Sequence, residues 1–254
     1  MMRDRFDYET YWWILDHLAA TNRLVRFADL LVGFPTTPFC IIRHDVDYSP
    51  AAALRLAEQE SNGGIRATYF LLLNSIYYNL LSPAHATFAR DLVAMGHEVG
   101  LHYDMNFLEA FPREAWCDLI HVQAGLLGEL SGKKVTTIAM HQPGLYGDDP
   151  LRNTGDFLNA YDDRFYRDMP YVSDSCRAWW DHAWEMFSAG NTPSRLQLAL
   201  HPINWDECDR DRETIFSSLH SDLARSIELA GGELLEKIAS HKGVLQHVAR
   251  NERG

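Results

Sequence analysis

Five short apolar runs of the sequence are each followed directly by residues that can bind metal ions or transfer protons. These residues are Asp45 and Asp47, His102, His141, Asp174, and His201. One such residue alone would indicate a helix cap or a structural side chain. Carboxylates and imidazoles are also the ligands of catalytic zinc sites and the usual general acids and bases near neutral pH. Their recurrence at the same place in successive segments predicts a single site for metal-assisted acid–base chemistry.

The spacing of Asp45 and Asp47 has a chemical meaning of its own. Residues two apart in an extended chain point to the same side, so both carboxylates face one place. One of them can bind a cation while the other takes a proton from a water on that cation. The sequence therefore predicts a carboxylate pair with divided roles.

The segment His97-Glu98-Val99-Gly100-Leu101-His102 looks like a zinc-protease helix, but its spacing differs. That motif needs two histidines four residues apart on one helix face. Here they are five apart, with a glycine between them. We expect His102 to follow a strand and His97, after a helix-ending glycine, to be structural. Glu98 is left without a role.

The elements that must position these residues alternate between strands and helices. Apolar runs predict strands at 39–42, 67–73, 98–101, 136–140, 171–173 and 196–200. Amphipathic spacing predicts helices at 8–32, 50–60, 83–95, 112–130 and 212–230, the last ended by Gly231-Gly232. Such alternation predicts a parallel sheet whose strands have their carboxyl ends at one face, where sites are built.

The length of 254 residues and the hydrophobic content of 46% fit a single α/β barrel domain. We expect residues 1–38 to form an N-terminal helical extension. Residues 39–205 would form the catalytic core, and residues 206–254 C-terminal helices.

Charge and cysteine spacing exclude several classes of function. The net charge of −12 disfavours binding to nucleic acid and to anionic membranes. No apolar run is long enough to span a membrane. The four cysteines form no CxxC pair, so a thiolate zinc site is not expected. The charged N-terminus differs from a signal peptide, and together these features predict a cytoplasmic protein with free thiols. They give no indication of the oligomeric state.

These segments resemble the polysaccharide deacetylase family, also described as the NodB-homology domain or carbohydrate esterase family four. Arg43-His44-Asp45-Val46-Asp47 stands where the family has Thr-Phe-Asp-Asp-Gly, and residues 96–102 match its Gly-His-Glu-Ile-Gly-Asn-His segment. His141-Gln142-Pro143 replaces an Arg-x-Pro motif, and Leu198-Ala199-Leu200-His201 resembles the last motif. The resemblance covers residues 40–205. It implies a distorted (β/α) barrel of about seven parallel strands, here with an N-terminal helical extension.

The resemblance also implies one divalent metal ion, with zinc expected, and a role for each site residue. Asp45 would be the general base, and His201 the general acid that protonates the leaving amine. Asp47 and His102 would bind the metal. His141 stands where an arginine normally orients the base, so it would orient Asp45 or complete the coordination shell.

The third metal ligand stays open at this point. The second metal-binding histidine of the family is Asn106 in this chain. Asp104, Asn106 through its carbonyl oxygen, or His141 could take its place. We favour Asp104, because a carboxylate is the better ligand for a hard or borderline cation.

The expected reaction is hydrolysis of an N-acyl group, usually acetyl, on an amino sugar or related small molecule. Ser173-Asp174-Ser175 and the two tryptophans after it resemble the motif that lines the acetyl pocket and steadies the acidic histidine. The expected substrate-contacting residues are Tyr103, Asn106, Asp174, Trp179 and Trp180. Two alternatives remain. The chain could hydrolyse a small non-sugar amide, or it could be a non-catalytic barrel relative that binds a sugar-like ligand.

Overall fold

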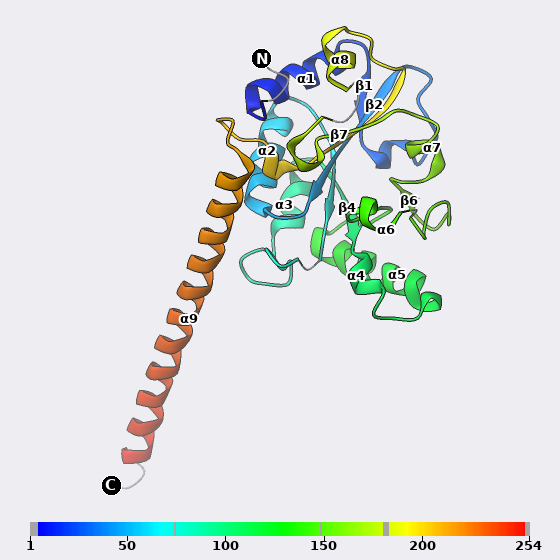
Figure 1. The fold of residues 1–254 in the computed structure, drawn as a ribbon. Helices are drawn as coiled ribbons and strands as arrows, with labels where there is room; N and C mark the ends of the chain where they lie inside the picture. Colours follow the sequence, from blue (N-terminus) through cyan, green and yellow to red (C-terminus); the bar gives the residue numbers. More distant parts are fainter. Residues whose placement is uncertain (1–4, 74, 148, 180–182, 252–254) are drawn as a thin grey trace. The chain divides into compact units, whose positions relative to one another are not determined.

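The computed structural model describes residues 5–73, 75–147, 149–179 and 183–251, and their side chains as far as residue 239. The chain divides into two compact units, Met1–Arg210 and Asp211–Gly254. The larger unit contains the whole sheet, and the smaller unit contains helix α9 (Arg212–Asn251) (Figure 1). Among the described helices, none combines the length and the hydrophobicity that a membrane span requires.

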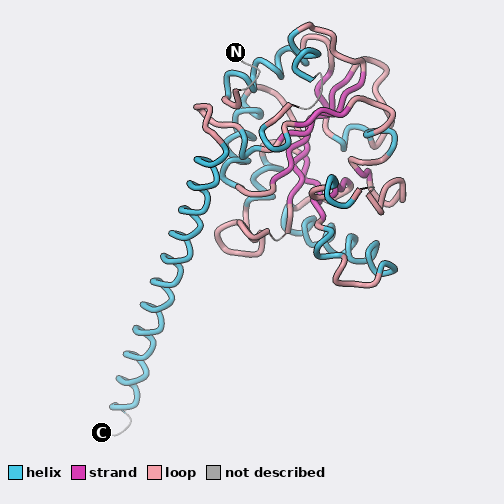
Figure 2. The backbone as a smooth tube through the Cα atoms, in the orientation of Figure 1, coloured by secondary structure: helices cyan, strands magenta, loops and turns pink. Residues whose placement is uncertain are grey.

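All pairings in the eight-stranded sheet are parallel, as predicted. The strands are β1 (Arg23–Val25), β2 (Phe39–Val46), β3 (Thr68–Leu71), β4 (Glu98–Tyr103), β5 (Thr137–Met140), β6 (Leu158–Asn159), β7 (Tyr171–Ser173) and β8 (Arg195–Leu200). Seven follow one another in the order β6-β5-β4-β3-β2-β8-β7, and β1 pairs with β2. Within the described residues no pairing joins β6 to β7, so the curled sheet is an open, distorted (β/α) barrel (Figure 2).

Helices connect successive strands. The longer ones in the larger unit are α1 (Tyr8–Ala19), α2 (Pro50–Asn62), α3 (Phe88–Ala94) and α5 (Trp116–Ser131). The short ones are α4 (Met105–Leu108), α6 (Pro143–Tyr146), α7 (Asp163–Tyr166) and α8 (Ala183–Ser188). Helix α2 begins as the sequence predicts, because the Ser49 side chain accepts a hydrogen bond from the Ala52 amide and Pro50 occupies the first turn.

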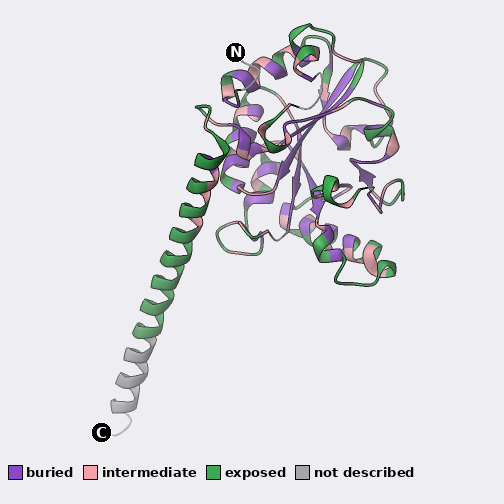
Figure 3. Cartoon of the chain, viewed as in Figure 1, coloured by how far each residue is buried: buried purple, intermediate pink, exposed green. Residues whose placement is uncertain are grey.

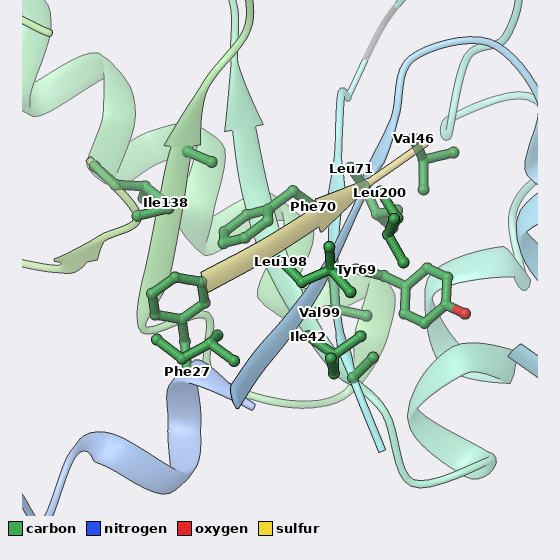
Figure 4. Packing of buried hydrophobic residues seen from close by; sticks show 14 of the residues in the cluster. Phe27, Ile42, Val46, Tyr69, Phe70, Leu71, Val99, Ile138, Leu198 and Leu200 are labelled. Carbon is green, nitrogen blue, oxygen red and sulfur yellow. The ribbon is translucent and has the colours of Figure 1, made fainter. Parts of the chain in front are cut away.

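The core lies around the middle of the sheet, where every residue of β2 is buried (Figure 3). Figure 4 shows apolar side chains from several strands packed together there, among them Ile42, Phe70, Ile138 and Leu198. Gly100 of β4 is the pairing partner of Phe70. A Cβ atom at Gly100 would lie 2.5 Å from the Phe70 ring, so this glycine is required for the ring to pack.

Several predicted helices have different bounds in the structure, and the one expected over residues 83–95 begins only at Phe88. The helix expected over residues 8–32 ends at Ala19, and Arg23–Val25 forms β1 instead. Strand β1 pairs with the first half of β2, at Phe39 to Ile41, whereas β3 pairs only from Arg43 onward. Tertiary pairing therefore overrides the local helical pattern. The predicted helix end at Gly231-Gly232 is also wrong, because α9 continues to Asn251.

Candidate metal centre and acid–base site

Strand β2 carries the centre of the site on one of its faces. Arg43 and Asp45 lie within the strand, and Asp47 follows one residue after its end. Side chains two apart in a strand share a face, so these three point to the same side. His44 is turned to the opposite side. The strand is longer than the apolar run 39–42 suggested, because its polar side chains find partners inside the protein.

Three side chains from neighbouring strand ends converge on one point. Asp47 Oδ1 lies 3.2 Å from His102 Nε2 and 3.2 Å from His141 Nδ1. The two histidine nitrogens are themselves 3.2 Å apart. Ligand atoms about 2.0–2.1 Å from a tetrahedral zinc ion stand about 3.3 Å from one another. The three atoms thus form one face of a coordination tetrahedron, and they are a group that could hold a metal ion.

The donor chemistry of this triangle also fits a cation. The Nδ1 atom of His102 is 2.9 Å from the carbonyl oxygen of Ala139 on β5. A carbonyl oxygen can only accept, so Nδ1 carries the hydrogen and Nε2 presents a lone pair to the triangle. The buried Asp47 Oδ1 has no hydrogen-bond partner. A cation bound in the triangle would satisfy both the lone pair of the neutral imidazole and this carboxylate oxygen.

Charge in the site keeps Asp47 ionised. Burial alone would raise the pKa of Asp47, but its interactions with His102 and His141 outweigh that effect and hold the pKa far below its usual range. A ligand must be deprotonated to bind metal, so Asp47 is ready to bind at any physiological pH.

The structure places Asp104 and Asn106 outside this triangle. Asp104 caps α4, where its Oδ1 accepts hydrogen bonds from the Asn106 backbone amide at 2.9 Å and from Asn106 Nδ2 at 3.0 Å. The Asn106 side-chain oxygen accepts from the Tyr146 hydroxyl at 2.8 Å. The third member of the group is His141, not Asp104 as we favoured. A carboxylate at a helix start is drawn to the free amides of its own first turn.

Asp45 is held by a residue that the sequence analysis did not assign. Arg43 Nη2 lies 2.6 Å from Asp45 Oδ2, and Arg43 Nε lies 3.1 Å from Asp45 Oδ1. The fully buried guanidinium also donates to Gln197 Oε1 and to the Tyr161 hydroxyl. Burial would raise the pKa of Asp45, but Arg43 outweighs it and lowers the pKa. Arg43 therefore orients Asp45, a role that we had considered for His141. The two-residue spacing from Asp45 was the signal for it.

His201 stands on the other side of Asp47 and is paired with Asp174. His201 Nδ1 is 2.6 Å from Asp174 Oδ1, and His201 Nε2 is 3.9 Å from Asp47 Oδ2. The fully buried Asp174 also accepts hydrogen bonds from the His201 amide and from Trp205 Nε1. Burial would lower the pKa of His201, but the charge of Asp174 and its hydrogen bond raise it to about 9. His201 is therefore protonated at neutral pH, as a general acid must be.

The aromatic residues expected to contact a sugar have other surroundings. Tyr103 is fully buried, and its hydroxyl donates to Asp149. It follows His102 directly in β4 and so points to the opposite face. The Trp179 ring stacks on Phe6 at 5.9 Å and packs against Trp205. Trp180 lies outside the described residues.

The opposite face of β2 carries a separate buried network around Glu60 of α2. Its carboxylate accepts hydrogen bonds from the Tyr69 hydroxyl at 2.6 Å and from the Tyr11 hydroxyl of α1, and it lies 2.9 Å from His44 Nε2. All four side chains are buried. His97 joins this region, with its ring nitrogens bonded to the Ala67 amide and the Ala57 carbonyl. The network fixes β2 from behind, and His97 is in the interior, away from the triangle.

No protein-family model matches the sequence, and no curated protein matches it significantly. Solved structures do match. Peptidoglycan deacetylase PdaC from Bacillus subtilis is 16% identical over 80% of this chain and 98% of that chain, with a TM-score of 0.44. A family 4 acetyl xylan esterase from Clostridium thermocellum, in complex with a cobalt ion, is 16% identical over 64% and 73%, with a TM-score of 0.43.

A third match is a pseudoenzyme of the same esterase family from Bacillus anthracis. It is 11% identical over 76% of this chain and 63% of that chain, with a TM-score of 0.41. Members of the family that the motifs resemble are among the matching solved structures, all at low identity. What this chain does has to be argued from its own residues.

Proposed function

We propose that this protein is a metal-dependent hydrolase that removes an N-acyl group, acetyl in the first instance, from an amino sugar or a related small molecule. The observation that carries the proposal is the triangle of Asp47, His102 and His141, with Asp45 and His201 beside it. We propose one zinc ion as the cofactor, because two imidazoles and one carboxylate that leave a position open are a catalytic zinc set.

The roles of the residues follow from their positions. A divalent cation in the triangle would supply Lewis acidity toward an acyl oxygen and lower the pKa of water. Asp45, kept ionised and oriented by Arg43, would accept the proton of the attacking water. His201, protonated through its pairing with Asp174, would donate a proton to the leaving nitrogen. The proton acceptor and the proton donor are thus separate groups on adjacent strands.

The test is a comparison of metal content and turnover in the same variants. Asp45→Asn and His201→Ala should retain the wild-type zinc content and lose roughly a hundredfold or more in turnover, the usual scale for positioned proton transfer. Asp47→Ala should lose the zinc as well. The substrates are a panel of N-acetylated amino sugars, with acetate release as the readout. Full zinc content in Asp47→Ala would refute the assignment of the metal ligand.

One observation favours the second candidate, a small non-sugar amide. Tyr103 is buried and Trp179 packs within an aromatic cluster, so Tyr103 offers no face for a sugar ring and Trp179 has one of its faces taken by Phe6. A panel of small amides, with release of amine or ammonia as the readout, separates the two candidates. Binding of a sugar without turnover on either panel would identify a non-catalytic relative.

A further inference from the structure

A regular apolar stripe runs along α9. Its members recur at spacings of three, four and four residues, and they are Phe216, Leu219, Leu223, Ile227, Ala230, Leu234 and Ile238. Eleven residues make slightly more than three turns of an α-helix, so a stripe with this period runs nearly parallel to the helix axis. Such a stripe can contact a second straight helix over its whole length.

The C-terminal part of the stripe is open to solvent. Ile227, Leu234 and Ile238 are 65%, 58% and 43% exposed, and Figure 3 shows most of α9 as exposed. Helices in proteins take most of their stability from packing of an apolar face. Apolar side chains in a row on an exposed helix mark an interaction surface.

Two glycines in the middle of α9 also indicate an interaction surface. Gly231 and Gly232 each destabilise a helix relative to alanine. Apart from the neighbouring backbone of the helix itself, a Cβ atom at either position would meet no described atom within 4 Å, so no close contact there requires glycine. Glycine on a helix allows another backbone to approach closely. The glycines thus fit a helix that crosses a partner at this point.

We propose that α9 pairs with α9 of a second copy of this chain, antiparallel, with the two-fold axis beside Ala230 and Gly231. From Leu223 to Ile238 the stripe is symmetric about that point. Ile227 and Leu234 are equally far from it, and so are Leu223 and Ile238. A two-fold interface uses the same surface on both copies, so each half of the stripe must match the other half read backward. The α9 stripe meets that condition from Leu223 to Ile238, with small residues at the axis and large ones on both sides.

Charged residues favour the antiparallel direction. Asp222 precedes Leu223 by one residue and Lys237 follows Leu234 by three, which puts both on the same flank of the stripe. The proposed axis places Asp222 of one copy within about 3 Å, along the helix direction, of Lys237 of the other. Neither residue has an ion-pair partner within the described part of the chain. The symmetric pair would therefore gain two interhelical ion pairs.

The experiment measures the mass of the full chain in solution by sedimentation over a range of concentrations. Wild type should be a dimer. Ile227→Glu should weaken dimerisation by roughly a hundredfold or more, because it buries an unpaired charge twice in one interface. Leu229→Glu is the matched control, since Leu229 is 63% exposed but lies about 200° around the helix from Ile227. This control should remain a dimer.

The direction of pairing is tested by exchanging charges. Asp222→Lys and Lys237→Asp should each weaken the dimer, and the double variant should restore it if the helices are antiparallel. A wild type that is monomeric at every concentration, or equal effects of Ile227→Glu and Leu229→Glu, would overturn the proposal. A dimer that the double variant does not restore would overturn the antiparallel arrangement.

Discussion

The identity of the third metal ligand can be tested with a variant that separates His141 from Asp104. His141 Nδ1 completes the triangle at 3.2 Å from both other ligand atoms, whereas Asp104 is bonded to the amides of α4. At a zinc concentration one hundred times the dissociation constant, binding stabilises the native state by about 2.7 kcal/mol. For a unit of this size that corresponds to an increase in melting temperature of roughly 5–10 °C.

Replacing His141 by alanine leaves only two protein ligands. If zinc affinity falls by roughly a hundredfold, the same zinc concentration stabilises the variant by only about 0.4 kcal/mol, or about 1 °C. The assay is thermal unfolding of metal-stripped protein with and without zinc. The readout is the change in melting temperature on adding zinc. Asp104→Ala also removes a helix cap worth about 1 kcal/mol, but this loss is the same with and without zinc and cancels in the difference.

Asp104→Ala and Asn106→Ala are the controls, and both should keep the full zinc-induced increase in melting temperature. The reasoning from the triangle is refuted if His141→Ala keeps the increase while Asp104→Ala loses it. That result would restore Asp104 as the third ligand. Loss of the increase in all three variants would indicate that the segment after β4 is coupled to the metal centre as a whole.

Three further predictions concern the groups around the triangle. In metal-free protein, His201 should titrate near pH 9 by NMR, and Asp174→Asn should lower that pKa toward the ordinary value. Because the pKa is raised on folding, the stability gained from this pair is complete below about pH 6.5 and is lost as the pH rises through 9. Arg43→Met should destabilise the fold by about 3–5 kcal/mol in urea unfolding, because it strands the buried Asp45 charge, and adding Asp45→Leu should recover part of that loss. Glu60→Gln should also lower the unfolding free energy in urea, but it should leave the zinc-induced increase intact, because this residue lies behind β2.

The strands that carry the site were predictable because their apolar runs are continuous and their ends are chemically distinct. The segments 39–42, 98–101 and 196–200 all proved to be strands, and the residues after them meet. Strand β1 was missed because it lies in a segment whose spacing predicted a helix, and β6 was missed because it has only two residues. No local pattern distinguishes a segment as short as β6 from a loop.

The site was predictable in its members but less so in their contacts. Asp104 and His141 are both good ligand types, and only the cap of α4 shows that Asp104 is already bonded. Arg43 could have been paired with Asp45 from spacing, yet its burial depends on Gln197, far along the chain. Tyr103 was wrongly expected at the site, although its position next to His102 in a strand already turns it to the other face.

The two halves of the site are separated along the chain, and therefore in the order of their synthesis. The three residues of the triangle come from β2, β4 and β5, which lie on one side of the sheet with only β3 among them. Asp174 and His201 come from β7 and β8, which join on the other side of β2 and are the last to be synthesised. The cation site can therefore be complete while the proton donor is still missing. A metal ion bound at that stage would hold half of the sheet in register as a template for the strands that follow.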